Sequence, residues 1–202
     1  MQTFPLTLVL ASIPFMTSMG ITPGPNNVLV ASSGVNFGFR ATVPHILGIT
    51  FGYPVMLLIV GLGLAKIFIA LPLTHQVLKY VSIVYLLYLA WSIARSAAIS
   101  EARKIYKPMT FLQGAAFQWI NVKGWVAALS AVTTYTAVNS TLPLQIAALA
   151  MLAVVITLIS VSCWTVFGAV LRGFLHTESR RRWFNYSMAA LLAVSIIPVF
   201  WE

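Results

Sequence analysis

The sequence consists largely of long apolar runs separated by short polar gaps, and several runs exceed the roughly 18 residues that mark a membrane-spanning helix. Of the 202 residues, 60% are hydrophobic and 7% are charged. A soluble domain carries about 25% charged residues, so this composition does not provide a water-facing surface. The chain is therefore predicted to be an all-α integral membrane protein.

Six apolar segments are predicted to be transmembrane helices. The second and fifth are longer than the roughly 20 residues that cross a bilayer, which indicates that they are tilted. The predicted spans cover residues 5–33, 43–70, 77–97, 110–135, 143–171 and 183–201.

The basic residues indicate how these spans are oriented. Lys66 and Lys79 lie at the ends of spans two and three that flank the gap between these spans, and the gap after span four holds no basic residue. Basic residues favour the cytoplasmic side, so both termini are expected on the opposite, periplasmic side. The net charge of +9 could suggest nucleic acid as a partner, but its distribution is typical of membrane topology. Nine basic residues lie in the gaps after spans one, three and five or at the adjoining end of span three: Arg40, Arg95, Arg103, Lys104, Lys107, Arg172, Arg180, Arg181 and Arg182.

The first span is interrupted by the sequence TPGPNN. A proline lacks the N–H that would bond four residues back, and it pushes the preceding residue away from helical angles. Two prolines around a glycine should therefore break the helix, and the helix that follows offers free N–H groups at its positive end to a carboxylate. A purely structural kink and a hinge without ligand contacts are the alternatives. The predicted substrate-binding residues here are Thr22, Pro23, Gly24, Pro25, Asn26 and Asn27.

The fourth span carries a second polar group, Gln118, Asn121 and Lys123. A lysine near mid-depth costs roughly 2.5–3.5 kcal/mol on insertion scales, so a functional role is favoured over a lysine that extends to the interface. Lys123 is predicted to pair with a substrate carboxylate, and Gln118 and Asn121 are further predicted substrate-binding residues. Because burial disfavours the charged form of a lysine, Lys123 is also a candidate for proton coupling.

The two halves of the chain share this organisation. Residues 1–108 and 109–202 each hold three predicted spans, and each half opens with a span interrupted by polar residues. Since three is an odd number, the second half must enter the membrane from the opposite side. Inverted three-helix repeats with interrupted helices at matching places are typical of a transporter's binding site.

Several motifs together resemble the LysE/RhtB family of bacterial amino-acid exporters. They are TPGPNN, GFR at 38–40, Gly48 and Gly52, and FQWINVKGW in span four. The double asparagine and Asn-Val-Lys are most similar to the cysteine and O-acetylserine exporter branch. Many members have proline where Val122 stands, which leaves open whether span four is broken or merely polar. The resemblance implies a multi-pass protein of the bacterial inner membrane that exports small neutral or basic amino acids, driven by the proton gradient.

The residue types narrow the substrate and the coupling groups. The sequence has no aspartate, and its three glutamates lie in loops or at the terminus, so strongly cationic substrates are disfavoured and a small neutral amino acid fits better. Its ammonium group is expected at carbonyls freed near Met19 to Ile21 and at the side-chain oxygens of Asn26 and Asn121. His45 is the second candidate for proton coupling, with a merely interfacial position as the alternative.

Other readings stay open. Export of homoserine, threonine, leucine or arginine, a passive channel, and a heavy-metal exporter are the alternatives, whereas an enzyme is disfavoured because the histidines are scattered. No cofactor or metal site is predicted, and Cys163 is expected to be a small buried hydrophobe. The small-xxx-small patterns at 34–38 and 48–52 fit packing within one chain or the seam of a homodimer. Membrane lipid and a small amino acid are the expected partners.

Overall fold

The computed structural model describes residues 6–64, 72–96, 107–138, 141–175, 177–195 and 197, and these residues form helices and no strand. The predicted all-α class is thus confirmed for the described part of the chain. The elements are α1 (Leu6–Ile21), α2 (Pro25–Phe37), α3 (Phe39–Ile59), the π-helical η1 (Val60–Leu64), α5 (Pro72–Ser96), α6 (Phe111–Phe117), the 3-10 turn η3 (Gln118–Ile120), α7 (Val122–Tyr135), α8 (Leu142–Phe174) and α9 (Glu178–Val194).

Two of the described helices are long and apolar enough to cross a membrane, Phe39–Gly63 and Leu142–Phe174. The helices α1 and α2 make a third span if they are taken as one element bent by 51°. The first predicted span ends later than expected, because α2 continues to Phe37 and only Gly38 separates it from α3. Gly38 has φ 83°, a backbone conformation that glycine adopts without strain, so the turn needs no longer loop.

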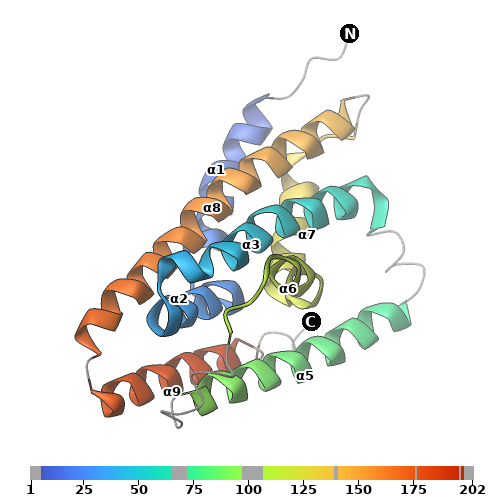
Figure 1. The fold of residues 1–202 in the computed structure, drawn as a ribbon. Coiled ribbons are helices and arrows are strands. Elements are labelled where there is room, and N and C mark those ends of the chain that lie inside the picture. Colours follow the sequence, from blue (N-terminus) through green and yellow to red (C-terminus); the bar gives the residue numbers. More distant parts are fainter. Residues whose placement is uncertain are drawn as a thin grey trace.

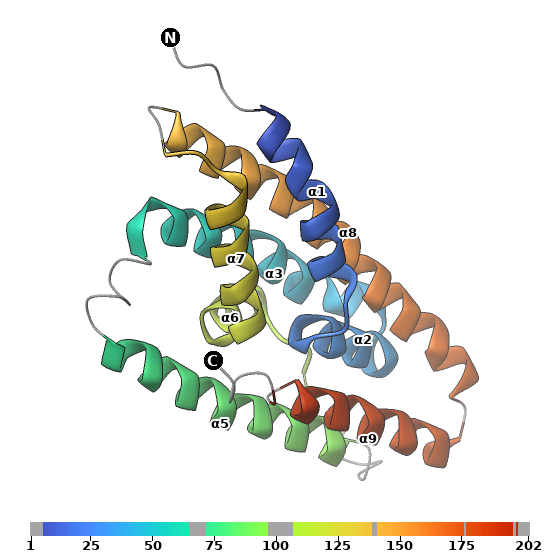
Figure 2. The same ribbon diagram turned by 180° about the vertical axis from the view of Figure 1, so that it is seen from behind.

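The long helix α8 runs diagonally along one side of the molecule (Figures 1 and 2) and packs against α1, α2 and α3. Helices α2 and α6 lie near the centre. Helices α5 and α9 pack side by side at one end of this bundle. Both interrupted segments therefore lie at the centre of the molecule.

Glycines allow two of the helix pairs to approach closely. A Cβ on Gly34 would meet the backbone of α8, and one on Gly168 would meet the backbone of α2. In the same way, Gly48 and Gly52 of α3 lie against the backbone of α6. The small-residue patterns are thus used for packing within one chain, while a homodimer stays a prediction.

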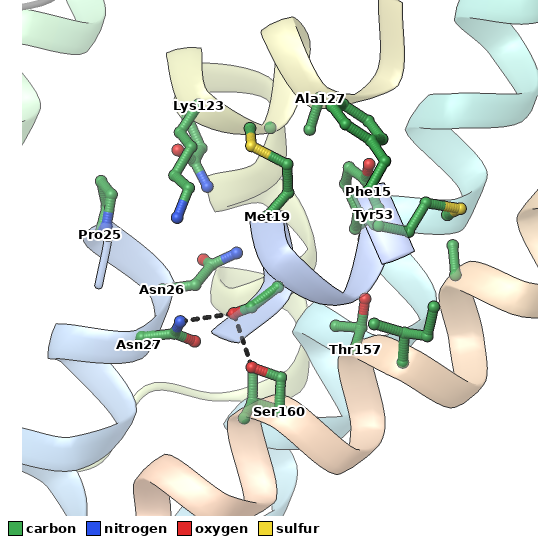
Figure 3. Close-up of a pocket in the computed structure, with 18 residues that line it drawn as sticks. Phe15, Met19, Pro25, Asn26, Asn27, Tyr53, Lys123, Ala127, Thr157 and Ser160 are labelled. Carbon is green, nitrogen blue, oxygen red and sulfur yellow. Dashed lines mark hydrogen bonds between the residues drawn. The ribbon is translucent and has the colours of Figure 1, made fainter. Parts of the chain in front are cut away.

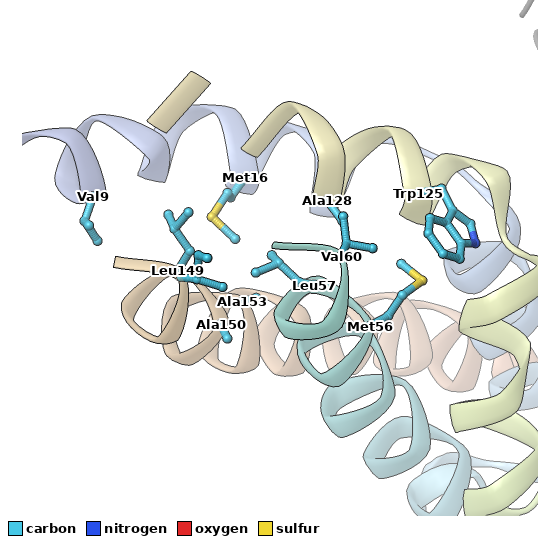
Figure 4. Packing of buried hydrophobic residues seen from close by; sticks show 11 residues of the cluster. Val9, Met16, Met56, Leu57, Val60, Trp125, Ala128, Leu149, Ala150 and Ala153 are labelled. Atoms are coloured by element: carbon cyan, nitrogen blue, oxygen red, sulfur yellow. The ribbon is translucent and has the colours of Figure 1, made fainter. Parts of the chain in front are cut away.

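Apolar side chains form the core and also cover much of the outside. One buried cluster joins α1, α3, α7 and α8 (Figure 4), and a second joins α2 and α6 to α5 and α9. Outward-facing residues such as Leu10, Phe51 and Val155 are at least half exposed, while polar Asn27 and Gln118 are buried. This distribution fits lipid as the surrounding solvent. Cys163 is exposed on α8, so its predicted burial is wrong: it lies on the apolar outer surface of that helix.

Candidate functional site

The predicted break in the first span is confirmed. Helix α1 ends at Ile21 and α2 begins at Pro25, which occupies the first helical turn, where a missing N–H costs least. Gly24 caps α2 in an extended conformation, with φ −168° and ψ 178°. The N–H of Val28 donates to the carbonyl of Gly24 at 2.9 Å, so only the N–H groups of Asn26 and Asn27 precede the first hydrogen bond of α2 and can face a ligand.

Side chains from α2 and α8 bind the carbonyls that the break releases. The Nδ2 atom of Asn27 donates to the carbonyl oxygen of Gly20 at 2.7 Å, and the hydroxyl of Ser160 donates to the same oxygen at 2.7 Å (Figure 3). The indole N–H of Trp164 donates to the carbonyl of Ile21 at 3.1 Å. These carbonyls, expected to hold a substrate's ammonium group, are thus already engaged by side chains of the protein.

Lys123 binds the remaining carbonyls of the break. Its Nζ atom lies 2.7 Å from the carbonyl oxygen of Thr22 and 3.5 Å from that of Pro23. The carbonyl of Thr22 also accepts a hydrogen bond from Asn27 Nδ2 at 3.0 Å. Lys123 and the break in the first span therefore form one polar cluster, although they lie about 100 residues apart in the sequence.

The fourth span is broken as well. Helix α6 ends at Phe117, η3 follows, and Asn121 is extended, with φ −88° and ψ 94°, before α7 begins at Val122. The interruption lies one residue before the position where proline is absent, so a broken helix does not require that proline. The side-chain oxygen of Asn121 is buried and has no hydrogen-bond partner.

An amide pair connects the two breaks. Asn26 Nδ2 donates to Gln118 Oε1 at 2.9 Å, and Gln118 Nε2 donates back to Asn26 Oδ1 at 3.2 Å. Gln118 is fully buried and also donates to the carbonyl of Gly114 at 2.9 Å. Gln118 therefore holds the side chain of Asn26 in one orientation.

A cavity of about 80 Å³ lies between the two breaks, several times the roughly 10–15 Å³ that one water molecule needs. No Asp or Glu is among the described residues that line it. Thr22, Pro23 and Gln118 do not line the cavity but bind residues that do. Of the predicted site residues, the cavity wall includes Gly24, Pro25, Asn26, Asn27, Asn121 and Lys123.

A family model described as LysE type translocator matches residues 17–195 of this sequence. The chain belongs to the LysE family. Among curated proteins, the cysteine/O-acetylserine efflux protein of Salmonella choleraesuis (strain SC-B67) is 30% identical over 183 residues, which cover 90% of this chain and 91% of the relative. The protein of the same name from Escherichia coli (strain K12) is 27% identical over 196 residues, covering 96% and 98%. No solved structure matches the chain.

Membership of the LysE family confirms the resemblance inferred from the motifs, and it identifies a membrane translocator rather than an enzyme. Part of each motif that carried the resemblance lines the cavity: residues 24–27 of TPGPNN, and Asn121, Lys123 and Gly124 of FQWINVKGW. Among the described residues, no group of three or more His, Cys, Asp or Glu could hold a metal ion.

The structure adds residues of α8 that the sequence reasoning missed in this LysE-family chain. Thr157 and Ser160 line the cavity, and Trp164 binds the break from the same helix. Their spacing of three and four residues within an otherwise apolar span places them on one helix face, and this periodicity is a signal that could have identified them. Tyr53 of α3, whose ring the sequence offers for a cation–π contact with the substrate's ammonium group, also lines the cavity.

His45, the second candidate for proton coupling, lies away from the cavity. It is 1% exposed, neither ring nitrogen has a hydrogen-bond partner, and it does not line the cavity. Its ring lies against Gly114, where a Cβ would come within 2.9 Å of the His45 ring carbon Cδ2. His45 is thus buried between α3 and α6.

Proposed function

We propose that this translocator exports small neutral amino acids from the cytoplasm, with cysteine and O-acetylserine as the substrates that fit best, and that the proton gradient drives it. The observation that carries the proposal is the cavity at the two helix breaks, which is small and mostly apolar, has a polar side formed by Asn26, Asn121 and Lys123, and is lined by no acidic residue in the described part of the chain. The relatives named as cysteine/O-acetylserine efflux proteins support this substrate class.

The substrate's carboxylate is proposed to bind where two helices begin. The first turn of α2 contributes Asn26 and Asn27 to the cavity, and the first turn of α7 contributes Lys123 and Gly124. Helix N-termini carry free N–H groups and a positive partial charge, which favour an anion. The unpartnered oxygen of Asn121 is an acceptor available to the substrate's ammonium group.

The six spans are proposed to form two inverted repeats, 1–108 and 109–202. In support, each half has a broken first span, and the last helices of the halves, α5 and α9, pack against each other. The first span of each half also packs against the second span of the other half: α1 and α2 contact α8, and α6 and α7 contact α3. The basic loops support a multi-pass inner-membrane protein with both termini in the periplasm.

Lys123 is the better of the two candidates for carrying the coupling proton, because it lines the cavity and His45 does not. A Lys123→Gln variant should still bind substrate measurably but should lose gradient-driven export. Lys107→Gln is the matched control, since Lys107 is exposed outside the helices. Export by Lys123→Gln at the wild-type rate would exclude this role.

The proposal is tested by overproducing the protein in cells preloaded with cysteine, O-acetylserine, threonine, homoserine, leucine or arginine. We expect the first two to leave fastest, and an uncoupler to abolish their export. Preferential release of threonine, leucine or arginine would assign a different substrate. Efflux that merely equilibrates and ignores the uncoupler would instead show a passive channel.

A further inference from the structure

We propose that the carbonyl pair of Thr22 and Pro23 is the binding site for the substrate's ammonium group, and that Lys123 occupies this site until a substrate displaces it. The Nζ atom of Lys123 lies 2.7 Å from one of these oxygens and 3.5 Å from the other. This inference rests on the proposed export of amino acids and adds how the site selects molecules that carry both charges.

The chemistry of the carbonyl pair suits an amino acid. The end of a lysine side chain is a primary ammonium on an alkyl carbon, with three N–H donors, and the amino group of an amino acid offers the same donors. The carbonyl oxygens accept bonds from a charged donor, which are roughly twice as strong as neutral ones. In the structure a primary amine, that of Lys123, already lies against this carbonyl pair.

The position of the lysine makes it an obstacle to a substrate. Lys123 lines the cavity, whereas Thr22 and Pro23, whose carbonyls it binds, do not. A substrate in the cavity can therefore bind these carbonyls only after the lysine side chain has moved. Once released, the lysine amino group can pair with the substrate's carboxylate in the same cavity.

Gly24 provides independent support. Its φ of −168° is ordinary extended backbone, which any residue adopts, so the backbone does not require glycine there. A Cβ at this position would lie 2.7 Å from Lys123 Cδ and 3.0 Å from Nζ. The absence of a side chain at Gly24 thus leaves the space in which the lysine lies across the break.

Displacement of the lysine requires both charged groups of an amino acid. An amine without a carboxylate would bring a second positive charge beside Lys123, and the two would repel each other. A carboxylate without an amine would draw Lys123 away, which leaves the carbonyl of Pro23 without its lysine donor and that of Thr22 with Asn27 alone. We therefore expect wild-type protein to discriminate against both kinds of molecule by about tenfold or more, the change that one charge-assisted hydrogen bond provides.

The test measures binding of cysteine, cysteamine (the amine without the carboxylate) and 3-mercaptopropionate (the carboxylate without the amine) to purified protein in lipid nanodiscs. Wild type should prefer cysteine. In Lys123→Met the carbonyl of Pro23 loses its lysine donor, that of Thr22 keeps only Asn27, and the lysine charge is gone. Affinity for cysteamine should therefore rise and affinity for cysteine should fall, each by about tenfold. Lys107→Met, at an exposed position, should behave as wild type.

Gly24→Ala is the second variant, because its methyl group displaces the lysine side chain and keeps the charge. It should also raise the affinity for cysteamine relative to cysteine, by less than Lys123→Met does. If the ratio of the two affinities in either folded variant equals that of wild type, the proposed ammonium site is wrong. Failure of wild type to export any amino acid would instead contradict the proposed function, so the two failures are distinguishable.

Discussion

The carbonyl of Gly20 offers the sharpest test of how the break is stabilised. Two donors from different helices bind it, Asn27 of α2 and Ser160 of α8, each at 2.7 Å. Both side chains are buried, with 5% and 3% exposure. Because one acceptor is shared by two donors, the single substitutions Asn27→Ala and Ser160→Ala should not act independently.

The expected magnitudes follow from the donors that each variant leaves. Ser160→Ala leaves Asn27 on the carbonyl of Gly20 and should cost about 1 kcal/mol. Asn27→Ala also removes the bond to Thr22, whose carbonyl keeps Lys123, and should cost about 1–2 kcal/mol. The double variant leaves the carbonyl without either side-chain donor, so its loss should exceed the sum of the single losses by about 1–2 kcal/mol.

The assay is thermal unfolding of the purified variants in one detergent, followed by intrinsic fluorescence. An excess loss of about 1–2 kcal/mol corresponds to an additional drop in Tm of roughly 2–8 °C for a chain of this size. The control pairs Ser160→Ala with Asn36→Ala, because Asn36 donates within α2 to the carbonyl of Ser32 and shares no acceptor with Ser160. Losses that simply add for Asn27 and Ser160, as they should for the control pair, would refute the shared-acceptor model.

Three further substitutions test other parts of the molecule. Gly168→Ala should lower Tm, at a cost of about 1–3 kcal/mol, because its Cβ would overlap the backbone of α2. Gly173→Ala is the control and should leave Tm unchanged, since the space around it is open. Equal shifts in Tm would contradict the close packing of α2 and α8. Gln118→Leu should weaken substrate binding in nanodiscs by releasing the Asn26 side chain, and an unchanged Kd would show that Gln118 plays no positioning role. His45→Leu should raise Tm, because it removes two buried nitrogens that have no hydrogen-bond partner. The variant should also keep uncoupler-sensitive export. Loss of coupling in a folded variant would make His45 the proton carrier.

The break in the first span could be predicted because its cause is local. Pro23 and Pro25 lack the N–H groups that a continuous helix needs, and this deficit is visible in the residue types alone. The partners that satisfy the break could not be predicted in the same way. Ser160 lies 140 residues from Gly20 in the sequence, and only the packing of α8 against α1 and α2 brings them together.

The break in the fourth span shows the opposite limit. With valine at position 122, the sequence offers no missing N–H and leaves both outcomes open. The structure has α6 tighten into the 3-10 turn η3, after which Asn121 leaves the helical region. Helix α6 packs closely against α3 at Gly48 and Gly52, a contact that the residue types within the fourth span do not reveal.

The two features that looked costly in the sequence satisfy each other in the structure. A helix break inside a membrane leaves carbonyls without donors, and a lysine at mid-span leaves a charge without an acceptor, and each alone costs several kcal/mol. Lys123 binds the carbonyls of Thr22 and Pro23, so each feature supplies the group that the other lacks. From the sequence, Lys123 was predicted to bind an anionic substrate group, because no acidic side chain is available in the membrane spans. Its contact with backbone carbonyls could not be predicted, since every residue has a carbonyl and the residue types do not show which ones lack a donor. In a chain with no aspartate and three glutamates, a broken helix provides the acceptors that acidic side chains would otherwise supply.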